Sequence, residues 1–190
     1  MKNNTENPTK KPQTKEKLQA LIEAEMEKHG DQCDLNHIDV SLVTNFYRLF
    51  YRSEFNGDIS GWNVSAVTDM DSMFEKSKFS GDISKWNVSK VKNMFCMFQE
   101  SKFNGDISGW DVLGVTEMGS MFAQSQFKSD ISNWNVSSVA SMNSMFCNSE
   151  FKGDISRWRT FRVKNMNGTF HRSKFNGDIS KWDVSSVNNM

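Results

Sequence analysis

Residues 55–78 read Phe-Asn-Gly-Asp-Ile-Ser-Gly-Trp-Asn-Val-Ser-Ala-Val-Thr-Asp-Met-Asp-Ser-Met-Phe-Glu-Lys-Ser-Lys, and nearly the same text returns every 24 residues. The copies run without insertion or deletion and open at Phe55, Phe79, Phe103, Phe127, Phe151 and Phe175. The last copy stops at Met190, after 16 residues. A fixed period of this length is the signature of a repeat architecture in which each copy forms one structural unit.

Three segments precede these copies. Residues 1–13 are polar and predict a disordered tail. Residues 14–30 predict an amphipathic helix that stops at Gly30. Its apolar residues at helical spacing are Leu18, Leu21, Ile22 and Met26. Residues 31–54 are a degenerate copy of the repeat. Because the first turn of a repeat stack otherwise exposes its core, we expect the helix and the degenerate copy to cap residues 55–190, which hold five full repeats and one partial repeat.

Within the first copy, Ile59-x-x-Trp62-x-Val64 has the form of a leucine-rich-repeat strand. Alternation along such a strand turns Trp62 and Val64 inward and their neighbours outward. The next stretch, residues 67–74, changes to a three-residue apolar spacing, which fits a short helical or 3₁₀ return on the convex side. The pattern therefore predicts a repeat solenoid with one short parallel β-strand per 24-residue turn and a concave strand face.

The composition excludes several classes of function. The 23 basic and 23 acidic side chains balance to a net charge of zero, which argues against a general nucleic-acid or membrane-surface binder. The three cysteines are odd in number and lack zinc spacing, so we expect free thiols and no metal or cofactor. No phosphate loop or nucleophile motif appears, so we expect no enzyme. The N-terminus lacks a signal-peptide pattern, and no stretch is long enough to span a bilayer, which together favour the cytoplasm.

The recurring string Phe-x-Gly-Asp-Ile-Ser-x-Trp-x-Val-Ser-x-Val-x-x-Met-x-x-Met-Phe-x-x-Ser resembles the repeat of BspA-type leucine-rich-repeat surface proteins, which share the mycoplasma lipoprotein-associated repeat. The resemblance covers residues 31–190. It implies a leucine-rich-repeat-like, right-handed solenoid and a non-catalytic role such as adhesion or protein binding. It also implies a bacterial cell surface, in contrast to the cytoplasm that the missing export signal favours.

One copy departs from the others at positions that we expect to face outward. Residues 151–174 carry Arg157, Arg159 and Phe161 where most other copies hold small or amide side chains, although one copy has Leu113. This copy contains seven basic groups and one acidic group. Arginine and aromatic side chains are the usual anchors of binding energy. We therefore predict a recognition patch for an acidic protein segment or an anionic glycan. Its predicted binding residues are Arg157, Arg159, Phe161, Arg162, Asn133, Asn135, Lys181 and Leu113.

Alternatives remain open at this stage. The arginines can be neutral variation of an exposed surface, and the chain can be a structural spacer or a self-associating assembly protein without a face-specific ligand. The C-terminal turn leaves an unpaired edge, so a homodimer through that edge is a further expectation. One aspartate per copy, as in Asp58, can bind calcium, but we favour bonds to its own turn's backbone amides. The tryptophans of the repeat can stack on sugars, but their inward position favours the core.

Overall fold

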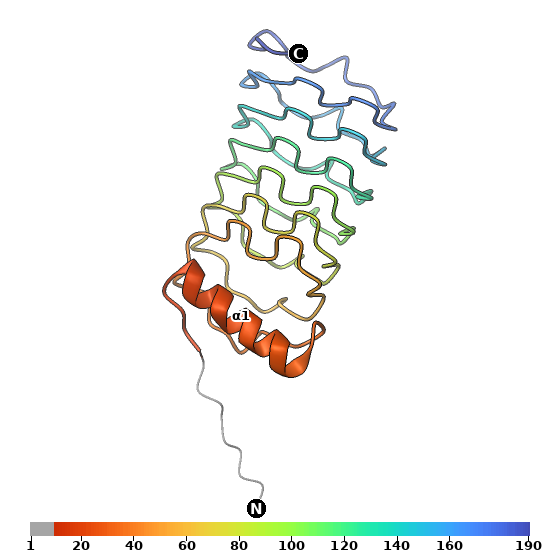
Figure 1. Cartoon of the computed structure of the whole chain (residues 1–190). Helices are drawn as coiled ribbons and strands as arrows, with labels where there is room; N and C mark the ends of the chain where they lie inside the picture. Colours follow the sequence, from red (N-terminus) through yellow and green to blue (C-terminus); the bar gives the residue numbers. More distant parts are fainter. Residues whose placement is uncertain (1–9) are drawn as a thin grey trace, which may run out of the picture.

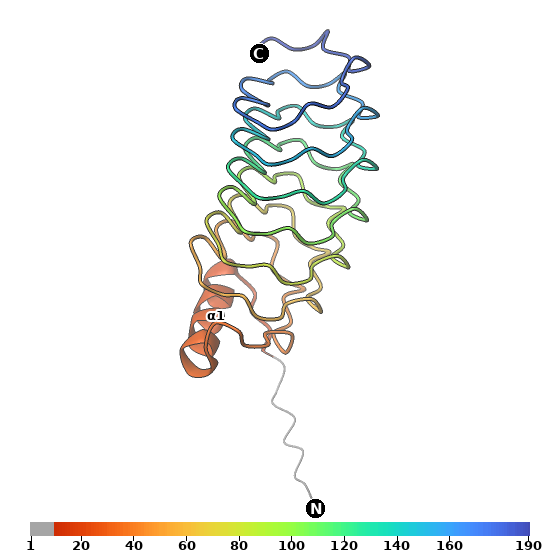
Figure 2. The same cartoon turned by 90° about the vertical axis from the view of Figure 1, so that its right-hand side faces the viewer.

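The computed structural model describes residues 10–190 and shows a stack of coils, each made of one 24-residue repeat, with α1 lying across the N-terminal end (Figure 1). The view turned by 90° shows the same stack (Figure 2). Residues 1–9 of the expected tail lie outside the described residues. The rest of that segment is not a free tail, since Lys10 forms a parallel bridge with Ile38 and Pro12 is buried.

One continuous column of parallel bridges runs through the coils, and a further bridge, between Asp34 and Asp58, joins the degenerate coil to the first full copy. Each bridge links a residue to the one 24 positions later, in the series Asn45, Asp69, Asn93, Glu117, Ser141, Asn165 and Asn189. No bridge in this series slips by a residue. Residues 24 apart therefore lie over one another, and a position of the repeat becomes a column in space.

The hydrogen bonds between coils concentrate in residues 68–76 and their equivalents, which we call the ladder segment. The amides of Met70, Ser72 and Phe74 donate to carbonyls of the next coil at 2.8–2.9 Å. The intervening amides close local turns, as Met73 does to the Met70 carbonyl at 3.2 Å. Ser72 and Lys76 have φ of 55° and 59°, and equivalent residues repeat this left-handed conformation in the following coils. The ladder segment is thus a series of β-turns.

The structure therefore differs from the strand expected at Ile59–Val64 and from the helical return expected at residues 67–74. No β-bridge falls within Ile59–Val64, and the predicted helical return is the ladder segment, because β-turns produce the same three-residue spacing. Local bonds explain the first difference. The Ser60 amide donates to Asp58 Oδ1, and the Trp62 amide donates to the Ile59 carbonyl. Amides committed to these turns cannot pair with the adjacent coil.

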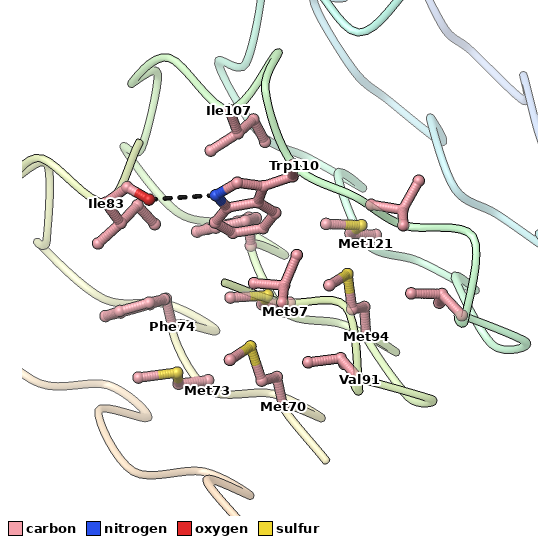
Figure 3. Close-up of a cluster of buried hydrophobic side chains, with 14 of the residues drawn as sticks. Met70, Met73, Phe74, Ile83, Val91, Met94, Met97, Ile107, Trp110 and Met121 are labelled. Atoms are coloured by element: carbon pink, nitrogen blue, oxygen red, sulfur yellow. Dashed lines mark hydrogen bonds between the residues drawn. The ribbon is translucent and has the colours of Figure 1, made fainter. Parts of the chain in front are cut away.

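The core consists of apolar columns. The tryptophans of the repeat are buried, with at most 8% of any residue exposed, as their inward position predicts. Each indole also donates to a backbone carbonyl of the preceding coil, and Figure 3 shows the bond from Trp110 Nε1 to the Ile83 oxygen at 3.1 Å. Methionines such as Met94 and Met97 fill the space beneath the ring. Phenylalanine rings stack from coil to coil, as Phe74 does on Phe98 with centroids 5.7 Å apart.

Helix α1 (Lys15–His29) closes the N-terminal end of the core. It begins after Thr14, whose hydroxyl accepts from the Lys17 amide, and ends at Gly30, whose φ of 82° suits glycine. Leu18 and Ile22 are buried against the degenerate coil, while Leu21 and Met26 are partly buried. Glu25 is also buried and pairs with Lys10. The helix thus covers apolar surface that the first coil would otherwise expose.

Candidate functional site

The predicted patch lies on the surface formed by the outward positions of residues 61–66 and their equivalents, which we call the asparagine face. Four residues of the patch share one hollow of about 210 Å³: Asn133, Asn135, Arg157 and Arg159. Ser132 and the edge of Trp134 complete its lining. The hollow spans two adjacent coils, with amide side chains on one and guanidinium groups on the other. Two arginines beside two amides can bind a carboxylate or another oxyanion.

The two arginines carry no salt bridge within residues 10–190. Both side chains are exposed. Their charge is therefore not consumed by a neighbouring carboxylate of the coil stack and remains available to a partner. Guanidinium groups present several donors in a planar fork, which suits bidentate binding of carboxylates.

Arg159 replaces a side chain that has a structural task in every other full or partial copy. At its position Asn63, Asn87, Asp111, Asn135 and Asp183 each accept a hydrogen bond from the amide two residues later, at 3.0–3.2 Å. Arginine has no acceptor and cannot make this bond to the Phe161 amide. The copy at residues 151–174 thus breaks a local rule of its own repeat. Such departures are expected at functional positions.

Phe161 and Arg162 form a second part of the patch beside the hollow. Phe161 is 42% exposed, and the Arg162 guanidinium carbon lies 5.9 Å from its ring centroid, within cation–π range. Leu113 is 47% exposed and occupies the same column two coils earlier. Lys181 is exposed in the Arg157 column of the following coil, but it does not line the hollow. The structure therefore joins four predicted residues in one hollow and leaves the other four around it.

A second hollow, which the sequence did not single out, lies on a different edge of the coils. We call it the lysine hollow: Lys128, Glu150, Lys152 and Lys174 line a space of about 360 Å³, together with Gly153. Lys174 pairs with Glu150 at 2.7 Å, and this bond, with the nearby Lys128 and Lys152, lowers the pKa of the Glu150 carboxyl. The charge count of residues 151–174 indicates an excess of basic side chains. It does not reveal that Lys152 and Lys174 line one hollow while Arg157 and Arg159 line another.

The aspartates at the position of Asp58 in each copy, which we call the aspartate column, accept hydrogen bonds within their own turns. In each copy the Asp Oδ1 accepts from the serine amide two residues later at 2.8–2.9 Å, which confirms the predicted turn role. This backbone bond, followed by the serine hydroxyl, lowers the pKa of each of these aspartates. Among residues 10–190 no three His, Cys, Asp or Glu side chains gather as a metal site.

The Cys96 thiol is buried and unpaired. Burial raises the pKa of the Cys96 thiol to about 12, so at neutral pH this sulfur is protonated and is a poor nucleophile. The described part of the chain contains no helix that combines the length and apolarity needed to cross a bilayer.

Comparison with known proteins identifies the repeat. A family model described as Mycoplasma protein of unknown function, DUF285, matches residues 19–126 and 100–190. Neither the curated proteins nor the solved structures include a match to the chain. The two matched segments overlap and together span residues 19–190, far more than half of the sequence. The chain therefore belongs to this repeat-containing Mycoplasma family of unknown function.

Proposed function

We propose that the chain is a non-catalytic binding module, a leucine-rich-repeat-like solenoid of the BspA surface type, whose asparagine face binds an acidic protein segment. The observation that carries the proposal is the substitution of Arg159 for the turn-forming Asn or Asp of the other copies. The coil gives up a local hydrogen bond there and gains an unpaired guanidinium beside Arg157. A hydrogen bond of this kind contributes about 1 kcal/mol, so its loss is a measurable cost to the fold.

The chemistry of the patch selects the partner. Arg157 and Arg159 offer donors for side-chain carboxylates, and Asn133 and Asn135 offer both donors and acceptors for a backbone. The exposed ring of Phe161 adds an apolar contact next to the charges. A protein segment that alternates acidic and apolar side chains satisfies both requirements. Arginine and aromatic anchors of this kind commonly dominate binding energy.

The test replaces the patch with the residues of the preceding coil. We select binders from a displayed library of acidic 12-residue peptides and measure their affinity for the wild type and for the Arg157→Asn, Arg159→Asn, Phe161→Ser variant. The replacements copy Asn133, Asn135 and Ser137, so we expect the coil to remain folded. Loss of two charged contacts and one aromatic contact predicts that Kd rises by at least about 30-fold, corresponding to roughly 2 kcal/mol.

A matched control removes two positive charges from the same face of an earlier coil, in the variant Lys85→Asn, Lys90→Ser. These residues occupy the repeat positions of Arg157 and Arg162. We expect its affinity to remain within about threefold of the wild type, because exposed charges several coils away are screened. Peptides that bind the folded patch variant as tightly as the wild type contradict the proposed site.

A second candidate function is self-association through the C-terminal coil. It is supported by a hollow of about 380 Å³ lined mainly by apolar side chains, among them Met166, Phe170 and Trp182. Three more of its lining residues, Ile179, Val184 and Met190, are 37%, 44% and 77% exposed. We propose that two copies bury this surface against each other in a two-fold dimer.

A further inference from the structure

Four of the seven basic residues of the coil at 151–174 line two separate hollows on the surface. Arg157 and Arg159 line the hollow on the asparagine face, whereas Lys152 and Lys174 line the lysine hollow, and the two hollows share no residue. A ligand bound at Arg157 and Arg159 therefore does not explain why Lys152 and Lys174 gather in the second hollow.

The lysine hollow carries an excess of positive charge. Three lysines surround one carboxylate, and only Lys174 is paired with it, through distances of 2.7 and 2.8 Å to the two Glu150 oxygens. Lys128 and Lys152 make no salt bridge within residues 10–190. Their side chains are exposed. The hollow thus retains two unpaired ammonium groups, which favour an anionic ligand.

A larger hollow of about 510 Å³ adjoins the lysine hollow, because Lys128 and Glu150 line both. Its remaining lining is four side-chain amides and a serine: Asn104, Gln124, Gln126, Asn148 and Ser125. Amides supply donors and acceptors in equal measure, which suits hydroxyl groups that are themselves both. The lining residues belong to three successive coils, from 103–126 to 151–174, so the combined groove runs along the stack.

The lining also argues against an ordinary peptide. No aromatic side chain and no Leu, Ile, Val or Met lines either hollow, and the apolar surface of the lysine hollow belongs to Gly153 and to the stems of its lysine and glutamate side chains. A peptide or drug-like ligand draws much of its affinity from apolar walls. Amides at one end, ammonium groups at the other and no apolar anchor favour a ligand that is rich in hydroxyls and carries negative charge. Acidic oligosaccharides combine these two properties.

We propose that the groove formed by the lysine hollow and the adjoining amides binds an acidic oligosaccharide, with its carboxylate or sulfate groups at Lys128, Lys152 and Lys174. Its hydroxyl groups lie along Gln124, Gln126 and Asn148. Glu150 holds Lys174 in place in the free protein and opposes an anionic ligand. This site is distinct from the peptide site at Arg157, so either can exist without the other.

The experiment measures binding by calorimetry of a tetrasaccharide of galacturonic acid and of the matching neutral tetrasaccharide of galactose, at low salt. We expect the acidic sugar to bind and the neutral sugar to bind at least about tenfold more weakly. The variant Lys128→Asn, Lys152→Asn, Lys174→Gln should weaken the acidic sugar at least about tenfold, because it removes all three charges. Its replacements occur at the same positions in other copies, as Asn104 and Gln126 do.

Two further variants separate the roles of charge and amide. Glu150→Gln, which copies Gln126, removes the repelling carboxylate and should strengthen binding of the acidic sugar roughly threefold or more. Gln124→Ala with Asn148→Ala leaves every charge in place. It should weaken the tetrasaccharide several-fold, while leaving the weak binding of inorganic sulfate unchanged.

The matched control is Lys85→Asn, Lys90→Ser, Lys92→Thr, which removes three lysines outside both hollows and copies residues of other copies. An equal loss of sugar binding in this control would mean non-specific attraction and would overturn the site. Binding of pentaglutamate as tightly as the acidic sugar would overturn the assignment of a glycan. So would the absence of any binding of the acidic sugar at millimolar concentration.

Discussion

Single side chains decide which backbone groups pair within a coil and which pair between coils. Asp58 and Asn63 bind amides two residues later, so these amides are lost to the neighbouring coil. On this side the link is supplied by the tryptophan ring, whose indole nitrogen donates to a carbonyl of the preceding coil. The ring is both part of the core and a connection between coils.

Trp110→Phe tests this link. A smaller phenyl ring would replace the indole, so some buried packing would be lost and the Ile83 carbonyl would also lose the donor that now lies 3.1 Å away. A buried carbonyl without its partner costs about 1–3 kcal/mol, so the urea midpoint should fall with little change in slope. Chemical unfolding followed by fluorescence of the remaining tryptophans measures this. Leu113→Ser in the same coil, which copies the usual repeat residue, should stay within about 0.5 kcal/mol of the wild type. Equal stability of the Trp110 variant would show that the bond contributes nothing.

At the scale of elements, each coil is a series of turns held by repeated acceptors. The aspartate column provides one such acceptor per coil, and Asn45 and Asn93 provide the same bond in the ladder segment. Helix α1 is the single regular element among the described residues, and it covers the first coil (Figure 1). Because each coil repeats the turn, an aspartate with a lowered pKa recurs in every copy of the stack.

The turn aspartates predict a loss of stability in acid. Hydrogen bonds hold their folded pKa below the unfolded value of about 3.9, so their contribution is complete above that pH and is lost as pH falls through the folded pKa. Asp39, with a pKa of about 2 beside Lys11, adds to the same trend. The urea midpoint should therefore fall steadily from about pH 5 to about pH 2.

Two variants identify the source of this acid loss. Asp106→Asn keeps the acceptor for the Ser108 amide but does not titrate, so the pH dependence should become shallower. Asp106→Ala removes the acceptor and should lower stability at every pH. An unchanged slope in Asp106→Asn would exclude the turn aspartate as a source of the acid loss.

At the scale of the whole stack, the first and last coils of residues 10–190 differ. Helix α1 covers the first coil, whereas the side chains of Ile179, Val184 and Met190 are exposed in the last coil of this range. Head-to-tail stacking of two copies would bury the apolar end against the outer side of α1, which is largely polar. A two-fold contact between two C-terminal coils instead pairs apolar surface with itself.

The dimer proposal predicts concentration-dependent mass in light scattering. Val184→Lys places a charge in the apolar contact surface of both copies, so this variant should be monomeric. Lys181→Asn alters charge on the same coil without adding or removing apolar surface and should leave association unchanged. A wild-type protein that stays monomeric at high concentration would exclude the dimer.

Much of the arrangement could be predicted from the period alone. The register of 24, the burial of Trp62 and Val64, and the turn role of Asp58 all follow from residue type and spacing. The helix expected at residues 14–30 and α1 (Lys15–His29) differ only at their ends. The strand could not be placed, because Ile59–Val64 has suitable side chains for a strand while its Ser60 and Trp62 amides are already used in turns.

Residue type and the period of 24 are enough to show which residues lie over one another, because a strict repeat transfers one residue's position to the next copy. The same comparison of copies shows that Arg157 and Arg159 are exceptional. The folded coils are needed to show that Lys128, Glu150 and Lys174 meet in one hollow and that Arg157 lines another. The physical reason is closure of the coil: residues more than 20 positions apart become neighbours only when each turn returns over the last. The path of that return depends on the competition between local turns and bonds between coils.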